Sequence, residues 1–191
     1  MIKNWIITLL TLVAVTAGSI HTEAQALDWQ IKRGEKLSYK ISFSSGLTGD
    51  VKGGTGVMYV SPAFSKINGK NTYHAILKGG TSGIIEWFYQ VENKYETYID
   101  TDTKAPVMYA QYVHENKYSN NDTVYFDQKK NTATYRNKPV KIPDNTHDFV
   151  SMLYYVRTLD MSKLKKGDAF IIPFFTSDKV INSKIIYNGI E

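Results

Sequence analysis

The sequence contains no cysteine among its 191 residues. This absence excludes disulfide bonds and thiolate metal ligands, and it also excludes the lipidated cysteine that anchors bacterial lipoproteins. The folded state must therefore be stabilised by its hydrophobic core alone, and 191 residues are enough for one such domain. Hydrophobic residues make up 42% of the chain and charged residues 21%, which is typical of a globular protein.

The sequence also lacks an apolar run long enough to cross a bilayer, which requires about 20 residues. Its longest apolar stretch, residues 6–17, follows a positive charge at Lys3 and precedes the small-residue site Ala24-Gln25-Ala26. This order is typical of a cleaved secretory signal. We therefore expect a signal peptide over residues 1–26, with an uncleaved anchor as the alternative, and an exported protein that is soluble after cleavage.

Concentrated charge is absent as well. The net charge is +5, and the signal peptide removes one charge of each sign. The basic residues are scattered, and the densest group is the short stretch 163–166. Nucleic-acid-binding proteins concentrate their basic residues on one face, so the sequence predicts no nucleic-acid partner. The positive charge is compatible with peripheral association with an anionic membrane surface.

The common catalytic and metal-binding motifs are missing. There is no H-E-x-x-H spacing, no G-x-S-x-G elbow and no phosphate loop that ends in Lys-Ser or Lys-Thr, so we expect no metal and no cofactor. His147, Asp148 and Ser151 have the residue types of a nucleophilic triad. Successive side chains on a helix point about 100° apart, so the first two do not converge, and we predict no catalytic residue.

Aromatic residues are abundant, with fourteen Tyr and eight Phe, and such residues favour strands. Apolar and polar residues alternate in many short segments, and Asn68-Gly69 predicts a two-residue type I′ hairpin. This pattern predicts an antiparallel sandwich or open barrel. The strands are expected at residues 35–43, 57–63, 72–78, 92–100, 107–118, 123–128, 132–137, 169–176 and 179–187, with a turn at 119–122 and a linker at 138–145.

One segment has a helical period instead. In residues 145–160, "NTHDFVSMLYYVRTLD", apolar residues recur every three or four positions. Asn145 or Thr146 is expected to be the N-cap. The pattern predicts one amphipathic helix at about 146–160 that packs on the sheet through Phe149, Met152, Leu153, Val156 and Leu159.

Two segments resemble a known family. "IPDNTHDFVSMLYYVRTLD" has a Pro, then Asp-x-x-Ser-x-x-Tyr, then Arg, and "GEKLSYKISFSSGLTGDVKGGTG" has a Tyr-containing strand before a Gly-rich one. Both are similar to DUF3108, a family of secreted envelope proteins of unknown function. The resemblance implies the periplasm or outer envelope of a Gram-negative bacterium, and a curved antiparallel sheet like that of the periplasmic lipoprotein carriers. It brings no catalytic residues.

Members of this family usually have a longer C-terminus. The sequence ends two residues after Asn188-Gly189, a hairpin signal with no returning strand. We therefore expect residues 27–191 to form a single β-rich domain that lacks its C-terminal strands.

The leading hypothesis is a non-enzymatic envelope protein that binds a lipid or another apolar ligand between the sheet and the helix. Residues 84–90 form the most aromatic apolar stretch, which makes Trp87 and Phe88 candidate ligand contacts. On the helix, Tyr154 and Arg157 share one flank at a spacing of three, and the Arg is a candidate for an anionic head group.

Two alternatives belong to other functional classes. A scaffold module would bind an envelope protein through an exposed strand edge. An envelope glycan hydrolase would need a pair of carboxylates in one cleft. The candidate carboxylates for the hydrolase are Glu86, Glu92, Glu96, Asp100 and Asp102.

Overall fold

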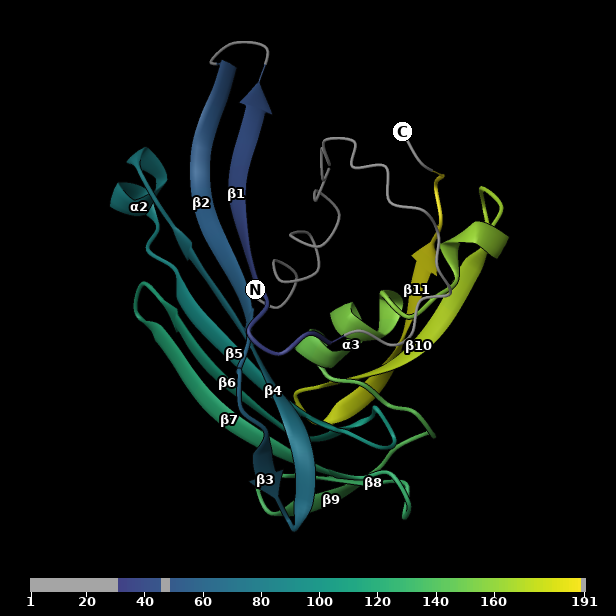
Figure 1. The fold of residues 1–191 in the computed structure, drawn as a ribbon. Helices are drawn as coiled ribbons and strands as arrows, with labels where there is room; N and C mark the ends of the chain where they lie inside the picture. The colour runs from purple at the N-terminus through teal and green to yellow at the C-terminus, as the bar shows by residue number, and fades with distance from the viewer. Residues whose placement is uncertain (1–30, 46–48, 190–191) are drawn as a thin grey trace.

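The computed structural model describes residues 31–45 and 49–189, so the expected signal peptide lies outside the described residues. The described chain is mainly β. A nine-stranded antiparallel sheet and a separate two-stranded hairpin flank one helix, α3 (Figure 1). This architecture confirms the predicted curved antiparallel sheet with one helix packed on it.

The large sheet is a meander in which nearly every strand pairs with its neighbour in the sequence. Its order is β1-β2-β4-β5-β6-β7-β8-β9, with the short β3 beside β4, and the hairpin is β10-β11. The strands of the sheet are β1 (Lys36–Ser45), β2 (Gly49–Val60), β3 (Ser65–Ile67), β4 (Lys70–Thr81), β5 (Glu92–Asp100), β6 (Pro106–Glu115), β7 (Tyr118–Asp127), β8 (Thr132–Tyr135) and β9 (Lys138–Lys141), and those of the hairpin are β10 (Ala169–Thr176) and β11 (Lys179–Ile186).

The sheet is curved because its strands bend and approach one another closely at defined places. Register shifts follow Ile41 in β1 and Tyr98 in β5. A Cβ atom at Gly54 would lie 2.5 Å from the carbonyl oxygen of Gly80, and one at Gly80 would lie 2.7 Å from that of Val91. Only glycine permits backbones to pass so closely, so a side chain at either position would push the neighbouring backbone away and change the curvature of the sheet there.

The turns agree with the sequence in one place and differ in two. Asn68 and Gly69 have φ values of 49° and 79°, which confirms the type I′ hairpin between β3 and β4. The turn predicted at 119–122 is wrong, because these residues belong to β7 and the chain reverses before it, next to Asn116 at φ 51°. The linker predicted at 138–145 begins with strand β9.

Helix α3 (Phe149–Val156) is shorter than the predicted helix at both ends. Asp148, not Asn145 or Thr146, is the N-cap, since its carboxylate accepts hydrogen bonds from the amides of Val150 and Ser151. His147 cannot be helical, because its backbone amide and carbonyl are bonded to strand β10 in a parallel bridge. The hairpin thus determines where the helix begins.

The core lies between the large sheet, α3 and the hairpin. An edge-to-face contact of 5.8 Å joins the rings of Phe126 in the sheet and Phe175 in β10. The buried cluster consists of Ile31, Met58, Val60, Ala75, Ile99, Tyr109, Val124, Phe126, Ala133, Ile142, Val150, Tyr154 and Phe175. Burial of these side chains is the main stabilising contribution in a chain without disulfides.

The helix buries more than the predicted stripe. Val150 and Tyr154 are its deepest apolar side chains, at 0% and 2% exposure. Helix α3 contacts both the sheet and β10, so it is buried on two sides. The predicted single apolar stripe would bury the helix against the sheet alone. Of the predicted stripe, Met152 is buried and the others are partly buried, namely Phe149, Leu153, Val156 and Leu159, the last of them beyond the end of the helix.

Candidate functional site

The layer between α3 and the strands beneath it is filled by side chains. Val150 and Tyr154 from the helix belong to the same buried cluster as Val60, Ala75 and Ile99 from the sheet. Phe149 adds an edge-to-face contact of 5.4 Å with Tyr95. A ligand directly beneath the helix would have to displace this packing.

A polar cluster is buried at the N-terminus of α3. The carboxylate of Asp148 accepts hydrogen bonds from the Thr97 hydroxyl at 2.6 Å and from the amides of Val150 and Ser151 at 2.9 Å. Burial raises the pKa of Asp148 to about 6, and these hydrogen bonds act in the opposite direction by stabilising the charged form. The cluster connects the helix to strand β5.

His147 lies beside this cluster and contacts Ser151, but the Asp148 carboxylate does not orient its ring. Its Nδ1 is 3.3 Å from the hydroxyl of Ser151, and its ring packs 4.6 Å from Tyr155. Its Nε2 has no hydrogen-bond partner among the described residues. Burial lowers the pKa of His147 to about 4, so the ring is neutral at pH 7. Asp148 bonds to Thr97 and to the helix amides, and all three triad-type residues are 0% exposed, so they do not form a nucleophilic triad.

The sheet continues beyond α3 as an arm formed by β1, β2 and β4 (Figure 1). The side of this arm that is continuous with the core, here called the inner arm face, is apolar. Tyr39 and Ile41 on it are 36% and 42% exposed. The pairing register places on this face Leu37, Tyr39, Ile41, Gly56, Met58, Leu77 and Gly79.

Two glycines, opposite each other in β2 and β4, leave part of this face without side chains. Gly56 pairs with Gly79, and the ring of Tyr39 lies over Gly56. Among the described residues, a Cβ atom at Gly79 would meet only the carbonyl oxygen of Thr55, at 3.8 Å. The inner arm face therefore has open space above Gly79, bordered by exposed apolar side chains.

A polar group lies where the arm meets the helix. The guanidinium of Arg157 donates two hydrogen bonds, of 2.7 and 2.8 Å, to Glu35, and it lies 5.3 Å from the ring of Tyr154. Burial raises the pKa of Tyr154 to about 12, and the charges of Glu35 and Tyr39 add to the shift. The Tyr154 hydroxyl is buried and has no hydrogen-bond partner among the described residues.

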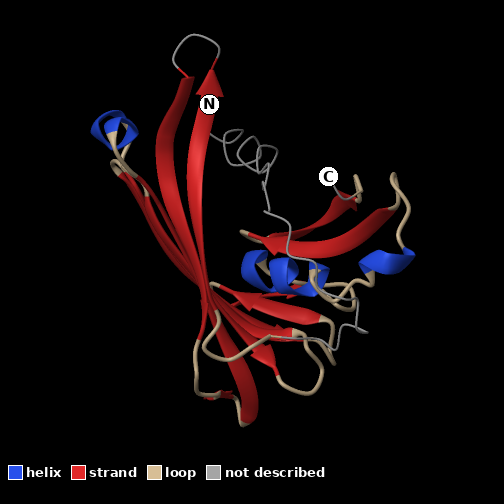
Figure 2. Cartoon of the chain, turned by 45° about the horizontal axis from the view of Figure 1, so that its top comes forward, coloured by secondary structure: helices blue, strands red, loops and turns tan. Residues whose placement is uncertain are grey.

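The structure separates the four predicted ligand contacts into two places. Tyr154 and Arg157 adjoin the inner arm face. Trp87 and Phe88 lie in α2 (Ile84–Phe88), 88% and 78% exposed, on the side of the sheet away from α3 (Figures 1 and 2). Gly79 was not among the predicted site residues. The glycine-rich stretch around it predicts a break in the strand and does not indicate which face of the sheet is left open.

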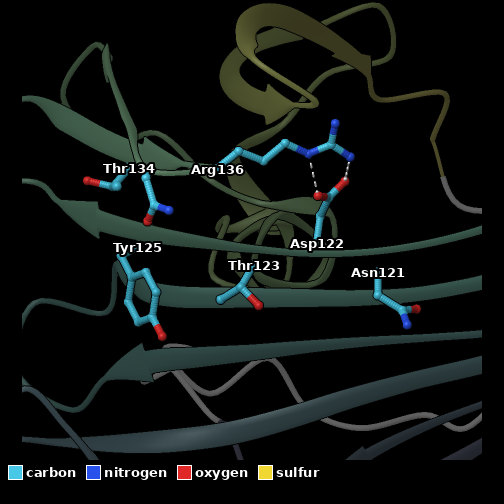
Figure 3. Close-up of a pocket in the computed structure, with 7 residues that line it drawn as sticks. Asn121, Asp122, Thr123, Tyr125, Thr134 and Arg136 are labelled. Carbon is cyan, nitrogen blue, oxygen red and sulfur yellow. Dashed lines mark hydrogen bonds and ion pairs between the residues drawn. The ribbon is translucent and has the colours of Figure 1, made fainter.

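A second feature is a hollow of about 280 Å³ beside β7 and β8 (Figure 3). The Asp122 carboxylate accepts bonds of 2.7 and 2.9 Å from Arg136. Burial by itself would raise the pKa of Asp122, but Arg136, Asn120 and Tyr135 lower it below its ordinary value. The lining residues are Asn121, Asp122, Thr123, Tyr125, Thr134, Arg136 and Asn137.

The carboxylates proposed for a hydrolase are not paired in a cleft. Glu96 bonds to Lys94 and lies 3.6 Å from His74, while Asp100 bonds to Lys70 at 2.7 Å. The remaining candidates, Glu86, Glu92 and Asp102, are exposed. The hollow beside β7 contains one carboxylate, Asp122, and Arg136 neutralises it. Glycoside hydrolysis requires two carboxyl groups across one bond, which these groups do not provide.

These features define a mainly β protein in which a curved antiparallel meander and a hairpin enclose one short helix. The family model described as "Protein of unknown function (DUF3108)" matches residues 38–191, so the chain belongs to this family. Comparisons with curated proteins and with solved structures give no match. Among the described residues, no helix has the length and apolarity needed to span a membrane.

Proposed function

We propose that this chain is an exported envelope protein that binds an apolar ligand, such as an acyl chain, without catalysing a reaction. The observation that carries the proposal is the inner arm face, where exposed Tyr39 and Ile41 border the open space above Gly79. The ligand lies along β1, β2 and β4, adjacent to α3, and the packed layer beneath the helix stays intact.

The physical reason is the free energy of exposed apolar surface. Covering such surface is favourable by about 25 cal/mol per Å². Large side chains on one face of a sheet, next to a strip without side chains, suit a flexible hydrocarbon chain. The aromatic Tyr39 ring and the aliphatic Ile41 both offer this contact, and a ligand needs no change in the core to reach them.

The polar end of the ligand lies at the base of the arm. The buried hydroxyl of Tyr154 has no partner among the described residues and can donate a hydrogen bond to an ester or amide carbonyl. Arg157 already forms a two-bond ion pair with Glu35, so a charged carboxylate would have to compete with that pair. The arrangement favours an uncharged polar group next to the hydrocarbon chain.

Export is the second part of the proposal. It is supported by the order of charge, apolar stretch and small residues at the start of the sequence. Fractionation of cells that express the full chain tests this part. The expected result is a processed protein in the periplasmic or outer-membrane fraction, and full-length protein in the cytoplasm contradicts it.

Ligand binding is tested with a fluorescent fatty-acid probe and the protein that lacks residues 1–26. Gly79→Leu places a side chain in the open space without a close backbone contact. We expect at least a tenfold loss of affinity, about 1.4 kcal/mol, with unchanged stability. Ile84→Ser, at a residue that is 60% exposed on α2, is the matched control and should bind normally. Absence of binding by the unmodified protein, or equal binding by Gly79→Leu, contradicts the proposal.

A further inference from the structure

The hollow beside β7 arises because β8, the strand that pairs with β7, is short. Strand β8 pairs with β7 only from Val124 to Asp127, so residues 121–123 lie beyond the end of β8. The β8–β9 turn carries Arg136, whose side chain lies beside that uncovered stretch (Figure 3), and Asn137 of the same turn also lines the hollow. The backbone of β7 and the turn thus form two walls of one site.

The chemistry of these walls is polar without net charge. The single acid, Asp122, is neutralised by Arg136, and hydrogen bonds from Asn120 and Tyr135 hold its carboxylate in place. Alternation along β7 places Asp122, and with it the paired Arg136, on the core face, whereas Asn121, Thr123 and Tyr125 are on the outer face. The other lining groups are amides and hydroxyls, with one aromatic ring that is 46% exposed, and these come from Asn121, Thr123, Thr134, Asn137 and Tyr125.

Aromatic rings continue from the hollow across the outer face of the sheet, which is the face opposite the core. The register places Tyr125, Met108, Tyr98 and His74 side by side on four successive strands. His74 and Tyr98 are stacked at 4.2 Å. In a parallel row, Tyr112, 44% exposed, stands opposite Asn121 of the hollow.

The distance between aromatic residues in this row matches the repeat of a polysaccharide. Strands in a sheet lie about 4.8 Å apart, so Tyr125 and Tyr98, two strands apart, are separated by about 10 Å. This separation is comparable to the length of a disaccharide unit in an extended β-linked polysaccharide. Sugar rings stack on aromatic faces, and their hydroxyl groups bond to amides and hydroxyls.

We propose that the outer face is a binding site for an extended β-linked glycan that runs across the strands. One sugar lies at the outer-face side of the hollow, against the ring of Tyr125, with hydrogen bonds to Asn121 and Asn137. The chain continues along Tyr112 and passes Tyr98, one face of whose ring is covered by His74. Glu96, the acid next to this path, is paired with Lys94 and does not repel a glycan that carries carboxylates. The site lies on the opposite side of the sheet from the inner arm face.

The experiment uses the protein without residues 1–26 and two probes, purified peptidoglycan sacculi in co-sedimentation and a soluble N-acetylglucosamine hexamer in titration. Tyr125→Ala and Tyr112→Ala each remove one exposed ring. Tyr118→Ala is the matched control, because Tyr118 is in the same strand as Tyr125, on the opposite face, and 57% exposed. We expect both test variants to lose at least tenfold in affinity for the hexamer, with the control unchanged.

The proposal is overturned if the unmodified protein binds neither probe, or if the Tyr118 control loses as much affinity as the two test variants. Binding of both probes through the same two tyrosines supports a wall glycan as the ligand. The result is independent of the apolar ligand. Tyr125→Ala should bind the fatty-acid probe normally, and Gly79→Leu should bind the hexamer normally.

Discussion

The hydroxyl of Thr97, in strand β5, donates a 2.6 Å hydrogen bond to the carboxylate of Asp148, the N-cap of helix α3, across 51 residues of sequence. Both groups are fully buried. The adjacent residue, His147, bonds through its backbone to β10. One buried cluster therefore joins the sheet, the helix and the hairpin, and it sets the position of α3 beside the inner arm face.

Replacing Thr97 by Val keeps the shape of the side chain and removes this hydrogen bond. A buried hydrogen bond to a charged group contributes about 1.5–3 kcal/mol, so we expect Thr97→Val to lower the free energy of unfolding by that amount. Urea denaturation measures the change. Thr123→Val, in an exposed position on β7, is the control and should be nearly neutral. Equal stabilities of the two variants would show that the Thr97–Asp148 bond contributes little.

The pH dependence of stability should separate His147 from Asp148. The folded-state pKa of His147, about 4, is below 6.5, so its contribution is lost as pH falls between these values. The folded-state pKa of Asp148, about 6, is above 3.8, so its contribution is present at low pH and is lost as pH rises between them. The two effects oppose each other in the native protein.

Single variants should reveal each effect. Relative to the native protein, Asp148→Asn should gain stability as pH rises from about 4 to about 7, because only the native protein carries the buried carboxylate. His147→Gln should show the opposite trend. Burial raises the pKa of Tyr109, which faces Asp148, well above its ordinary value, so this group stays neutral in this range. Chemical denaturation across the range is the measurement, and parallel curves for all three proteins would refute the assignment.

Two adjacent glycines should respond differently to the same substitution. A methyl group at Gly80 would be 2.7 Å from the Val91 carbonyl oxygen, so Gly80→Ala should destabilise the protein by about 1–3 kcal/mol. A methyl group at Gly79 has space, so Gly79→Ala should be neutral or stabilising by about 0.5 kcal/mol. Thermal unfolding compares the two. A larger loss at Gly79 than at Gly80 would contradict the described path of strand β4.

The ion pair in the hollow should be visible in the titration of Asp122. Arg136 lowers the pKa of this carboxyl, so Arg136→Gln should raise it. A carboxyl with a lowered pKa stabilises the folded state above its unfolded-state pKa, and this contribution is lost as pH falls. The variant should therefore lose less stability on acidification. Carbon-detected NMR of the carboxyl measures the shift, and an unchanged titration would exclude the contact in solution.

Much of the sheet could be predicted because the alternation of residues is a local property. Strand β10 matches its predicted range, and Asn68-Gly69 marked its hairpin correctly. Residues 119–122 were predicted to be a turn because they are polar. They are polar because β8 does not extend along this part of β7 and leaves its edge exposed. The start of α3 was not predicted because the backbone of His147 is bonded to β10, a strand that begins 22 residues later, at Ala169.

The candidate sites depend on register, which the sequence does not specify. Tyr154 and Arg157 could be placed together because a spacing of three brings side chains together on a helix. The apposition of Gly56 with Gly79 and the row from Tyr125 to His74 required the pairing of several strands. Trp87 and Phe88 were chosen for their apolar character, which does not reveal the side of the sheet on which α2 lies.

The central claim is that an apolar ligand occupies the inner arm face, and native mass spectrometry tests it most directly. The protein is purified without detergent from the envelope of cells that express the full chain, in parallel with Gly79→Leu. We predict a bound acyl lipid, seen as a mass increment that organic extraction removes, on the unmodified protein and a reduced amount on the variant. An unmodified protein without any such increment, or equal occupancy of both proteins, would contradict the claim.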